Sequence, residues 1–115
     1  MNLKTFDQFL ANRLADIQSI LGKKSADYSD GDDKLFNFKL AASMEGITPI
    51  ESLRGMHLKH RTSIRQGLDD LQHGKVRPWE WWVEKETDNI NYSILLLALI
   101  YEEYFNVKTT TDTKD

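Results

Sequence analysis

The sequence predicts an all-α protein that folds as a helical bundle of about four helices. Proline occurs only at positions 49 and 78, and no segment sustains the alternation of apolar and polar residues that a strand needs. The chain of 115 residues is 40% hydrophobic and 29% charged, which is typical of one globular domain with a single core. We therefore expect one all-α domain over residues 1–105 and a disordered tail over residues 106–115, whose sequence NVKTTTDTKD is polar.

Composition excludes several classes of protein. The chain has no cysteine, so disulfides and thiolate metal sites are excluded. Its longest apolar run, Ile94 to Tyr101, is far shorter than the roughly 20 residues that cross a bilayer, and the N-terminal sequence lacks an apolar leader. We expect a cytoplasmic protein without membrane contact. The net charge of −3 argues against binding to duplex nucleic acid, although basic residues between positions 59 and 77 leave a local anion site open.

The first helix is expected over about Thr5 to Leu21, where apolar residues recur at helical spacing. Gly22 follows this pattern and is expected to end the helix. A polar loop, Lys23 to Phe38, then leads into a short helix over about Phe36 to Met44 that Gly46 ends.

Two long helices complete the predicted bundle. Thr48 is a good N-cap and Pro49 suits the first helical turn, so the third helix is expected to run to about Gln72. The turn HGKVRP separates it from a last helix over about Trp79 to Phe105. Because this turn is short, we expect the two helices to form an antiparallel hairpin.

Polar side chains interrupt the apolar faces of this hairpin at a similar depth. One face of the third helix carries Leu53, His57, His60, Ile64, Leu68 and Leu71, and one stripe of the last helix carries Glu84, Asp88, Asn91, Leu95 and Ala98. At 1.5 Å per residue, His60 and Asn91 both lie about 18 Å from the turn. We therefore expect one polar pocket, with Glu84 nearer the turn, formed by His57, His60, Glu84, Asp88 and Asn91.

Structural explanations for the same residues remain open. Histidines on an apolar face are often hydrogen-bonded packing residues. A neighbouring stripe from Val83 to Leu97 could be the core face, which would leave Glu84 and Asp88 at its solvated edge. The tryptophans at positions 79, 81 and 82 could stack on a base, but such residues more often cap the end of a bundle or fill a dimer contact.

Four segments together resemble a known family. KSADYS, FNF, GMHLKHRTSI and WWVEKETDNINYSILLLAL are similar, in order and spacing, to small phage and prophage proteins akin to the nucleotide-modification-associated domain. That group is similar to the all-α NTP pyrophosphohydrolases of the MazG and dimeric dUTPase type. The resemblance covers about Lys23 to Glu103. It implies a MazG-like fold.

The resemblance also implies a metal site and a nucleotide site. In the pyrophosphohydrolases, ExxE on one helix and ExxxD on the next hold Mg²⁺. Glu84 to Asp88 fits ExxxD, whereas His57 and His60 stand where ExxE would be, a set that suits Mn²⁺ or a softer metal better than Mg²⁺. The implied metal ligands are His57, His60, Glu84 and Asp88, and the implied catalytic residues are His60, Glu84 and Asp88. The implied nucleotide-binding residues are Lys24, Asp27, Tyr28, Asn37, Lys59, Lys85, Asn91 and Tyr92.

Two functions follow as expectations. The first is a nucleotide-binding protein of phage or prophage type, which as an enzyme would be a metal-dependent hydrolase that converts a nucleoside triphosphate to the monophosphate and pyrophosphate. The alternative is a non-catalytic, oligomeric helical interaction protein whose site has decayed. In both cases the segment ILLLALIY, apolar on nearly every side, predicts a homo-oligomer, as the MazG-like relatives are.

Overall fold

The computed structural model describes residues 1–22 and 33–105 in full and residues 23–28 as helical backbone. The described chain is all-α, as predicted. Its elements are α1 (Leu3–Tyr28), α2 (Phe36–Glu45), α3 (Pro49–Gln72), α4 (Trp79–Ile100) and a terminal π-helix, η1 (Tyr101–Phe105). No helix in this described part is long and apolar enough to cross a membrane. The predicted disordered tail lies outside the described residues.

Helix α1 is longer than the sequence pattern predicted. It continues through Gly22 to Tyr28, so the prediction that Gly22 ends the helix is wrong. A glycine inside a helix costs only about 1 kcal/mol relative to alanine, which is too little to stop a helix that its neighbours favour. Gly22 also does not adopt the left-handed conformation of a helix-ending glycine, whereas Gly46 and Gly74 do, with φ of 71° and 81°.

The boundaries of α2 and α3 confirm the capping predictions. Gly46 follows α2 in the left-handed conformation, and α3 begins with Pro49 in its first turn. Thr48 forms a capping box with Glu51: the Thr48 hydroxyl accepts from the Glu51 amide at 3.1 Å, and the Glu51 carboxylate accepts from the Thr48 amide at 2.9 Å. These bonds satisfy two amides that the start of a helix leaves unpaired.

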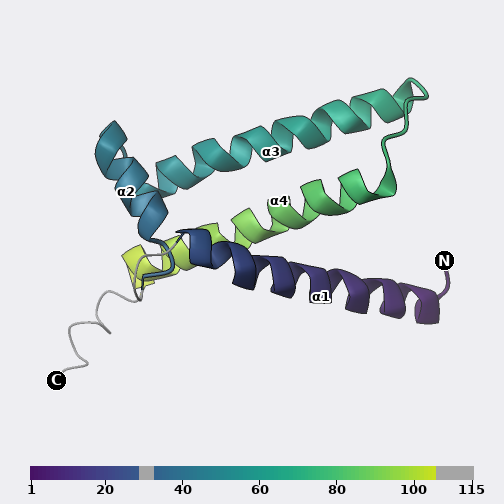
Figure 1. The fold of residues 1–115 in the computed structure, drawn as a ribbon, viewed down its shortest axis with the longest axis horizontal. Helices are drawn as coiled ribbons and strands as arrows, with labels where there is room; N and C mark the ends of the chain where they lie inside the picture. Colours follow the sequence, from purple (N-terminus) through teal and green to yellow (C-terminus); the bar gives the residue numbers. More distant parts are fainter. Residues whose placement is uncertain (29–32, 106–115) are drawn as a thin grey trace.

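Helices α3 and α4 form the predicted antiparallel hairpin (Figure 1). Helix α1 packs beside α4 and runs in the same direction, so the N-terminus of the chain lies at the same end as the α3–α4 turn (Figure 1). Helix α2 crosses the opposite end of the hairpin and contacts α3. The molecule is elongated, with extents of 56 × 35 × 22 Å.

The hydrophobic core lies at the α2 end of the hairpin. Its fully buried side chains are Phe38 from α2, Leu53 from α3 and Leu99 from α4. Leu35, Tyr92 and Leu95 complete the buried cluster. Each of the three helices contributes one large apolar anchor, so burial at this end fixes how they meet.

At the turn end of the hairpin, two tryptophans of α4 pack against a glycine of α3. Gly67 of α3 is buried, and Trp81 and Trp82 of α4 lie against the space where its side chain would be. Leu68 and Leu71, which we predicted on the inner face of α3, are 47% and 39% exposed. The inner stripe of α3 passes through Gly67 instead, because the large indoles need a position without a side chain.

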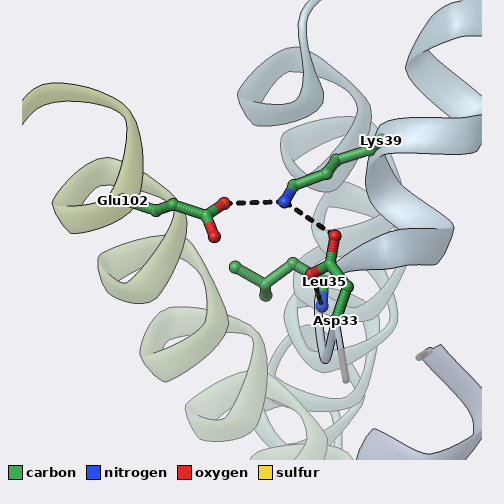
Figure 2. A network of polar contacts seen from close by, with 4 residues as sticks. All are labelled: Asp33, Leu35, Lys39 and Glu102. Atoms are coloured by element: carbon green, nitrogen blue, oxygen red, sulfur yellow. Dashed lines mark hydrogen bonds and ion pairs between the residues drawn. The ribbon is translucent and has the colours of Figure 1, made fainter. Parts of the chain in front are cut away.

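Lys39 links α2 to η1 through two carboxylates (Figure 2). Lys39 Nζ lies 2.8 Å from Asp33 Oδ2 and 2.8 Å from Glu102 Oε1, so it bridges the start of α2 and η1. The hydrogen bond from Lys39 is the main reason that the pKa of Asp33 is lowered. Burial alone would lower the pKa of Lys39, but its hydrogen bonds and ion pairs with the two carboxylates raise it overall.

Candidate functional site

The buried face of α4 carries polar groups at the middle of the hairpin. Asp88 is only 6% exposed and Asn91 only 4%, and Leu95 continues the same face with 6%. Glu84, one turn before Asp88, is exposed and lines a hollow with Arg13 and other residues of α1. The predicted convergence of polar groups therefore includes Asp88 and Asn91 but not Glu84.

His60 and Asp88 face each other across the hairpin. The imidazole Nδ1 of His60 lies 3.8 Å from Asp88 Oδ2, with the histidine side chain 25% exposed and the carboxylate side chain 7% exposed. This distance is too long for a direct hydrogen bond but short enough for an ion pair when His60 is protonated. The pair joins α3 and α4.

Tyr92 lies at the centre of a group of rings beside this pair. Its ring stacks on His57, with centroids 5.5 Å apart and planes 13° apart, and it also contacts His60 at 5.0 Å. Phe38 of α2 packs on Tyr92 in a T-shaped arrangement, with the ring centroids 6.4 Å apart. The rings fix where the two imidazoles lie relative to the buried polar groups of α4.

His57 is bound by a residue that the sequence analysis did not select. Its Nε2 is hydrogen-bonded to Asn89 Oδ1, and because that oxygen can only accept, Nε2 carries the proton. The Asn89 amide nitrogen donates in turn to Glu86 at 3.2 Å. Asn89 follows Asp88 directly, so its side chain points about 100° away from that carboxylate. The sequence analysis tested only the face of the last helix that carries Asp88. Placing the face that carries Asn89 against the third helix as well would have predicted this contact.

Asn91 is the chemically unusual residue of the site. Both polar atoms of its amide are buried and have no hydrogen-bond partner in the described part of the chain. Leaving such a group unsatisfied costs about 1–3 kcal/mol, and an exception of this kind in a folded protein needs an explanation. Asn91 lies one helical turn from Asp88 on the same side of α4, so the unpaired amide and the buried carboxylate are neighbours.

The other predicted site residues are dispersed. Lys24, Asp27 and Tyr28 belong to the helical end of α1, not to a loop, and their side chains lie outside the described residues. Asn37 is half-buried in α2, next to Phe38. The remaining two are cations: Lys59 is exposed on α3, and the Lys85 ammonium lies 6.0 Å from the centroid of the Trp81 ring.

The predicted metal ligands do not form one group. Within the described residues, no set of three or more histidine, aspartate or glutamate side chains is placed to hold a metal ion. His57 points to Asn89, Glu84 faces α1, and only His60 and Asp88 meet. The four side chains that the resemblance implies as metal ligands are therefore not assembled into one site in the described part of the chain.

Comparisons with known proteins identify no family for this chain. No protein-family model matches the chain, and neither the curated proteins nor the solved structures give a significant match.

Proposed function

We propose that the protein binds a nucleotide, and that His60, Asp88 and Asn91 recognise its nucleoside part. One observation carries the proposal: the Asn91 amide is buried without a partner, beside a buried carboxylate. An amide offers one donor direction and one acceptor direction in a plane, which is the pattern that the edge of a nucleobase can match. A ligand that pairs with this amide removes the cost of leaving it unsatisfied.

The neighbouring groups are suited to the same ligand. The Asp88 carboxylate lies one helical turn from Asn91 and 3.8 Å from the His60 imidazole, and carboxylates and imidazoles are groups that bind base amino groups and sugar hydroxyls. The family resemblance in the sequence points to the same class of ligand. Metal-dependent release of pyrophosphate, which that resemblance also implies, stays a prediction.

A thermal melt tests nucleotide binding most directly. We expect one or more members of a panel of nucleosides and nucleoside triphosphates to raise the melting temperature. A ligand at 100 times its Kd adds about 2.7 kcal/mol by mass action, or about 11 °C for a domain of this size. Each ligand is measured with and without Mg²⁺ and Mn²⁺. If every member of the panel leaves the melt unchanged, the proposal is wrong and the non-catalytic interaction protein is favoured.

The variant Asn91→Leu separates a binding role from a structural one. Leucine has nearly the shape of asparagine but needs no hydrogen bonds, so the variant without ligand should be as stable as the wild type or more stable. Its ligand-induced shift should disappear. The matched control is Asn12→Leu, at an exposed position of α1, which should keep the full shift. A strongly destabilised Asn91→Leu would show that the amide is a structural group.

Catalysis has its own assay. Pyrophosphate release from the triphosphate that binds best is measured for the wild type and for Asp88→Asn, in Mg²⁺ and in Mn²⁺. The hydrolase prediction requires release by the wild type and a large loss in the variant. Equal rates would remove Asp88 from any mechanism, and no release by the wild type would leave a binding protein.

We also propose that the protein forms a homo-oligomer through α4 and the first residue of η1. The side chains of Ile90, Ile94, Leu97 and Tyr101 follow one another at intervals of four, three and four residues, and are 39%, 42%, 67% and 54% exposed. This is the repeat of a helix that pairs with another helix, and two copies of such a seam are complementary to each other.

The shape of the chain supports this association. The radius of gyration is 17.3 Å, whereas a compact domain of this length would have about 13 Å. Light scattering after size exclusion should give at least a dimer for the wild type and a smaller species for Leu97→Glu. Leu58→Glu is a control at an apolar position of similar exposure on α3 and should keep the wild-type mass. A monomeric wild type would contradict the proposal.

A further inference from the structure

A concave surface lies on the His57–Asn89 side of the hairpin. It is a groove of about 570 Å³ between α3 and α4, and none of the residues proposed to recognise the nucleoside lines it. Its walls are formed by Glu51, Arg54, Gly55, His57, Leu58, Arg61, Asn89, Ser93 and Leu96. His57, which lines the groove, stacks on Tyr92, and the same tyrosine ring contacts His60 of the His60–Asp88 pair.

The two arginines of this groove differ from the other arginines of the chain. Arg13, Arg65 and Arg77 each form an ion pair with an aspartate, at 3.2, 3.2 and 2.9 Å. Arg54 and Arg61 form no hydrogen bond and no ion pair with any residue that the structure describes. Both line the groove. Arg54 attracts the Glu51 carboxylate only at a longer range than an ion pair. The guanidinium groups that form no ion pair with a described residue are therefore gathered on one concave surface.

Their spacing places the two cations along the groove. Arg54 and Arg61 are seven residues apart in α3, so they lie on the same side of the helix, about 10.5 Å apart along its axis. The space beside Gly55 is open, because this residue has no side chain and a Cβ atom there would meet nothing within 4 Å. A ligand that contacts both guanidinium groups must carry negative charge at two places along its length.

The other polar groups of the groove are already engaged. The Glu51 carboxylate caps α3, the Asn89 amide binds His57 and Glu86, and the Ser93 hydroxyl donates to the Asn89 carbonyl at 3.2 Å. The donors that remain for a ligand are thus mainly the two guanidinium groups, each of which can form paired hydrogen bonds with an anion. The groove is therefore suited to an acceptor-rich anion.

We propose that Arg54 and Arg61 form a binding site for a chain of two or more phosphate groups. Phosphate fits better than carboxylate, because exposed pairs of single charges contribute little, whereas each terminal phosphate of a chain carries up to two charges and three acceptor oxygens. Inorganic polyphosphate and the triphosphate of a nucleotide both contain such a chain. The inference does not depend on recognition of the nucleoside by Asn91.

Calorimetry with inorganic tripolyphosphate at low ionic strength tests the proposal. We expect measurable binding to the wild type and at least a tenfold loss of affinity in Arg54→Gln/Arg61→Gln. The control is Arg65→Gln/Lys75→Gln, which removes the same charge from an exposed position of α3 and from the turn that follows it, both outside the groove, and should change affinity less than twofold. Orthophosphate, which can contact only one arginine at a time, should bind at least tenfold more weakly than tripolyphosphate.

Several results would overturn the proposal: no binding of tripolyphosphate, an equal loss in both double variants, or equally tight binding of a hexaglutamate peptide. The last result would identify a site for acidic protein segments. Because all four substituted side chains are exposed, both variants should melt like the wild type.

Asn91→Leu separates this inference from nucleotide binding. That variant should bind tripolyphosphate normally. A nucleoside triphosphate that binds more tightly than tripolyphosphate should lose this additional affinity in Asn91→Leu. The affinity that it shares with tripolyphosphate should be lost in Arg54→Gln/Arg61→Gln. Nucleotide binding that depends on Asn91 but not on the arginines would refute the phosphate groove and leave the nucleoside site standing.

Discussion

The contact between Gly67 and the tryptophans predicts that even a methyl group at this position is destabilising. A Cβ atom on Gly67 would lie 2.7 Å from two carbon atoms of the Trp81 ring and 3.0 Å from one of Trp82. Carbon atoms in favourable contact are about 3.5–4.0 Å apart, so Trp81 would have to move by about 1 Å. That ring is held edge-to-face by Trp82 at 4.9 Å and lies under the Arg77 guanidinium at 4.4 Å.

The expected magnitude follows from two opposing effects. Alanine is favoured over glycine in a helix by about 0.8–1.0 kcal/mol. Overpacking costs about 1–3 kcal/mol, and weakening the aromatic and cation–π contacts of Trp81 adds about 0.5–1 kcal/mol. We therefore expect Gly67→Ala to lower the free energy of unfolding by about 1–2 kcal/mol, which lowers the melting temperature by about 4–8 °C for a domain of this size.

Circular dichroism melts and urea titrations measure this change against a control on the same helix. Gly55 is exposed, and a Cβ atom there would meet nothing within 4 Å. Gly55→Ala should therefore raise stability by up to about 1 kcal/mol through helix propensity alone. If Gly67→Ala is as stable as Gly55→Ala, the close packing of the indoles against α3 is refuted.

Two further predictions concern the elements around the site. Lys39→Met should cost about 1 kcal/mol, a small value because the ion pairs are partly exposed. The pKa of Asp33 is lowered from 3.8 and that of Lys39 is raised from 10.5, so the wild type should be more stable than Lys39→Met between these two pH values. This difference in stability should be lost as the pH falls below the lower value or rises above the upper one. Urea midpoints measured across pH test this. Thr48→Ala removes the hydroxyl that caps α3 and should cost about 1 kcal/mol, whereas Thr62→Ala at an exposed mid-helix position should be neutral or slightly stabilising in the same melts. Equal stability of Thr48→Ala and the wild type would contradict the capping box.

The parts of the fold that depend on short-range chemistry could be predicted from the sequence. Thr48, Pro49 and Gly46 act on their own backbone or on residues three positions away, so α3 begins and α2 ends as expected. The α3–α4 hairpin also follows from a local feature, the short turn between two amphipathic helices. Gly22 is the exception, because a helix tolerates glycine when its other residues favour the helical state.

The side chains that meet between helices could be predicted only in part. Residues 84, 88, 91, 95 and 98 share a stripe of α4, but the buried centre of that stripe is displaced toward Trp81, Tyr92 and Leu99. Helical spacing gives the width of a face but not the line along which a partner helix covers it, which depends on how the two helices cross. The same limit explains why His57 meets Asn89 while His60 meets Asp88.

The polar residues of the site lie between two regions that hold the hairpin independently of them. At one end, Phe38, Leu53 and Leu99 form the core, and at the other end the indoles pack on Gly67. Because burial at both ends fixes the register of α3 and α4, the unpaired Asn91 amide in the middle is not needed to align the helices. Alignment of the helices therefore does not explain why this amide is buried at a cost in free energy. Ligand binding, measured in a variant of Asn91 that still folds, tests its role.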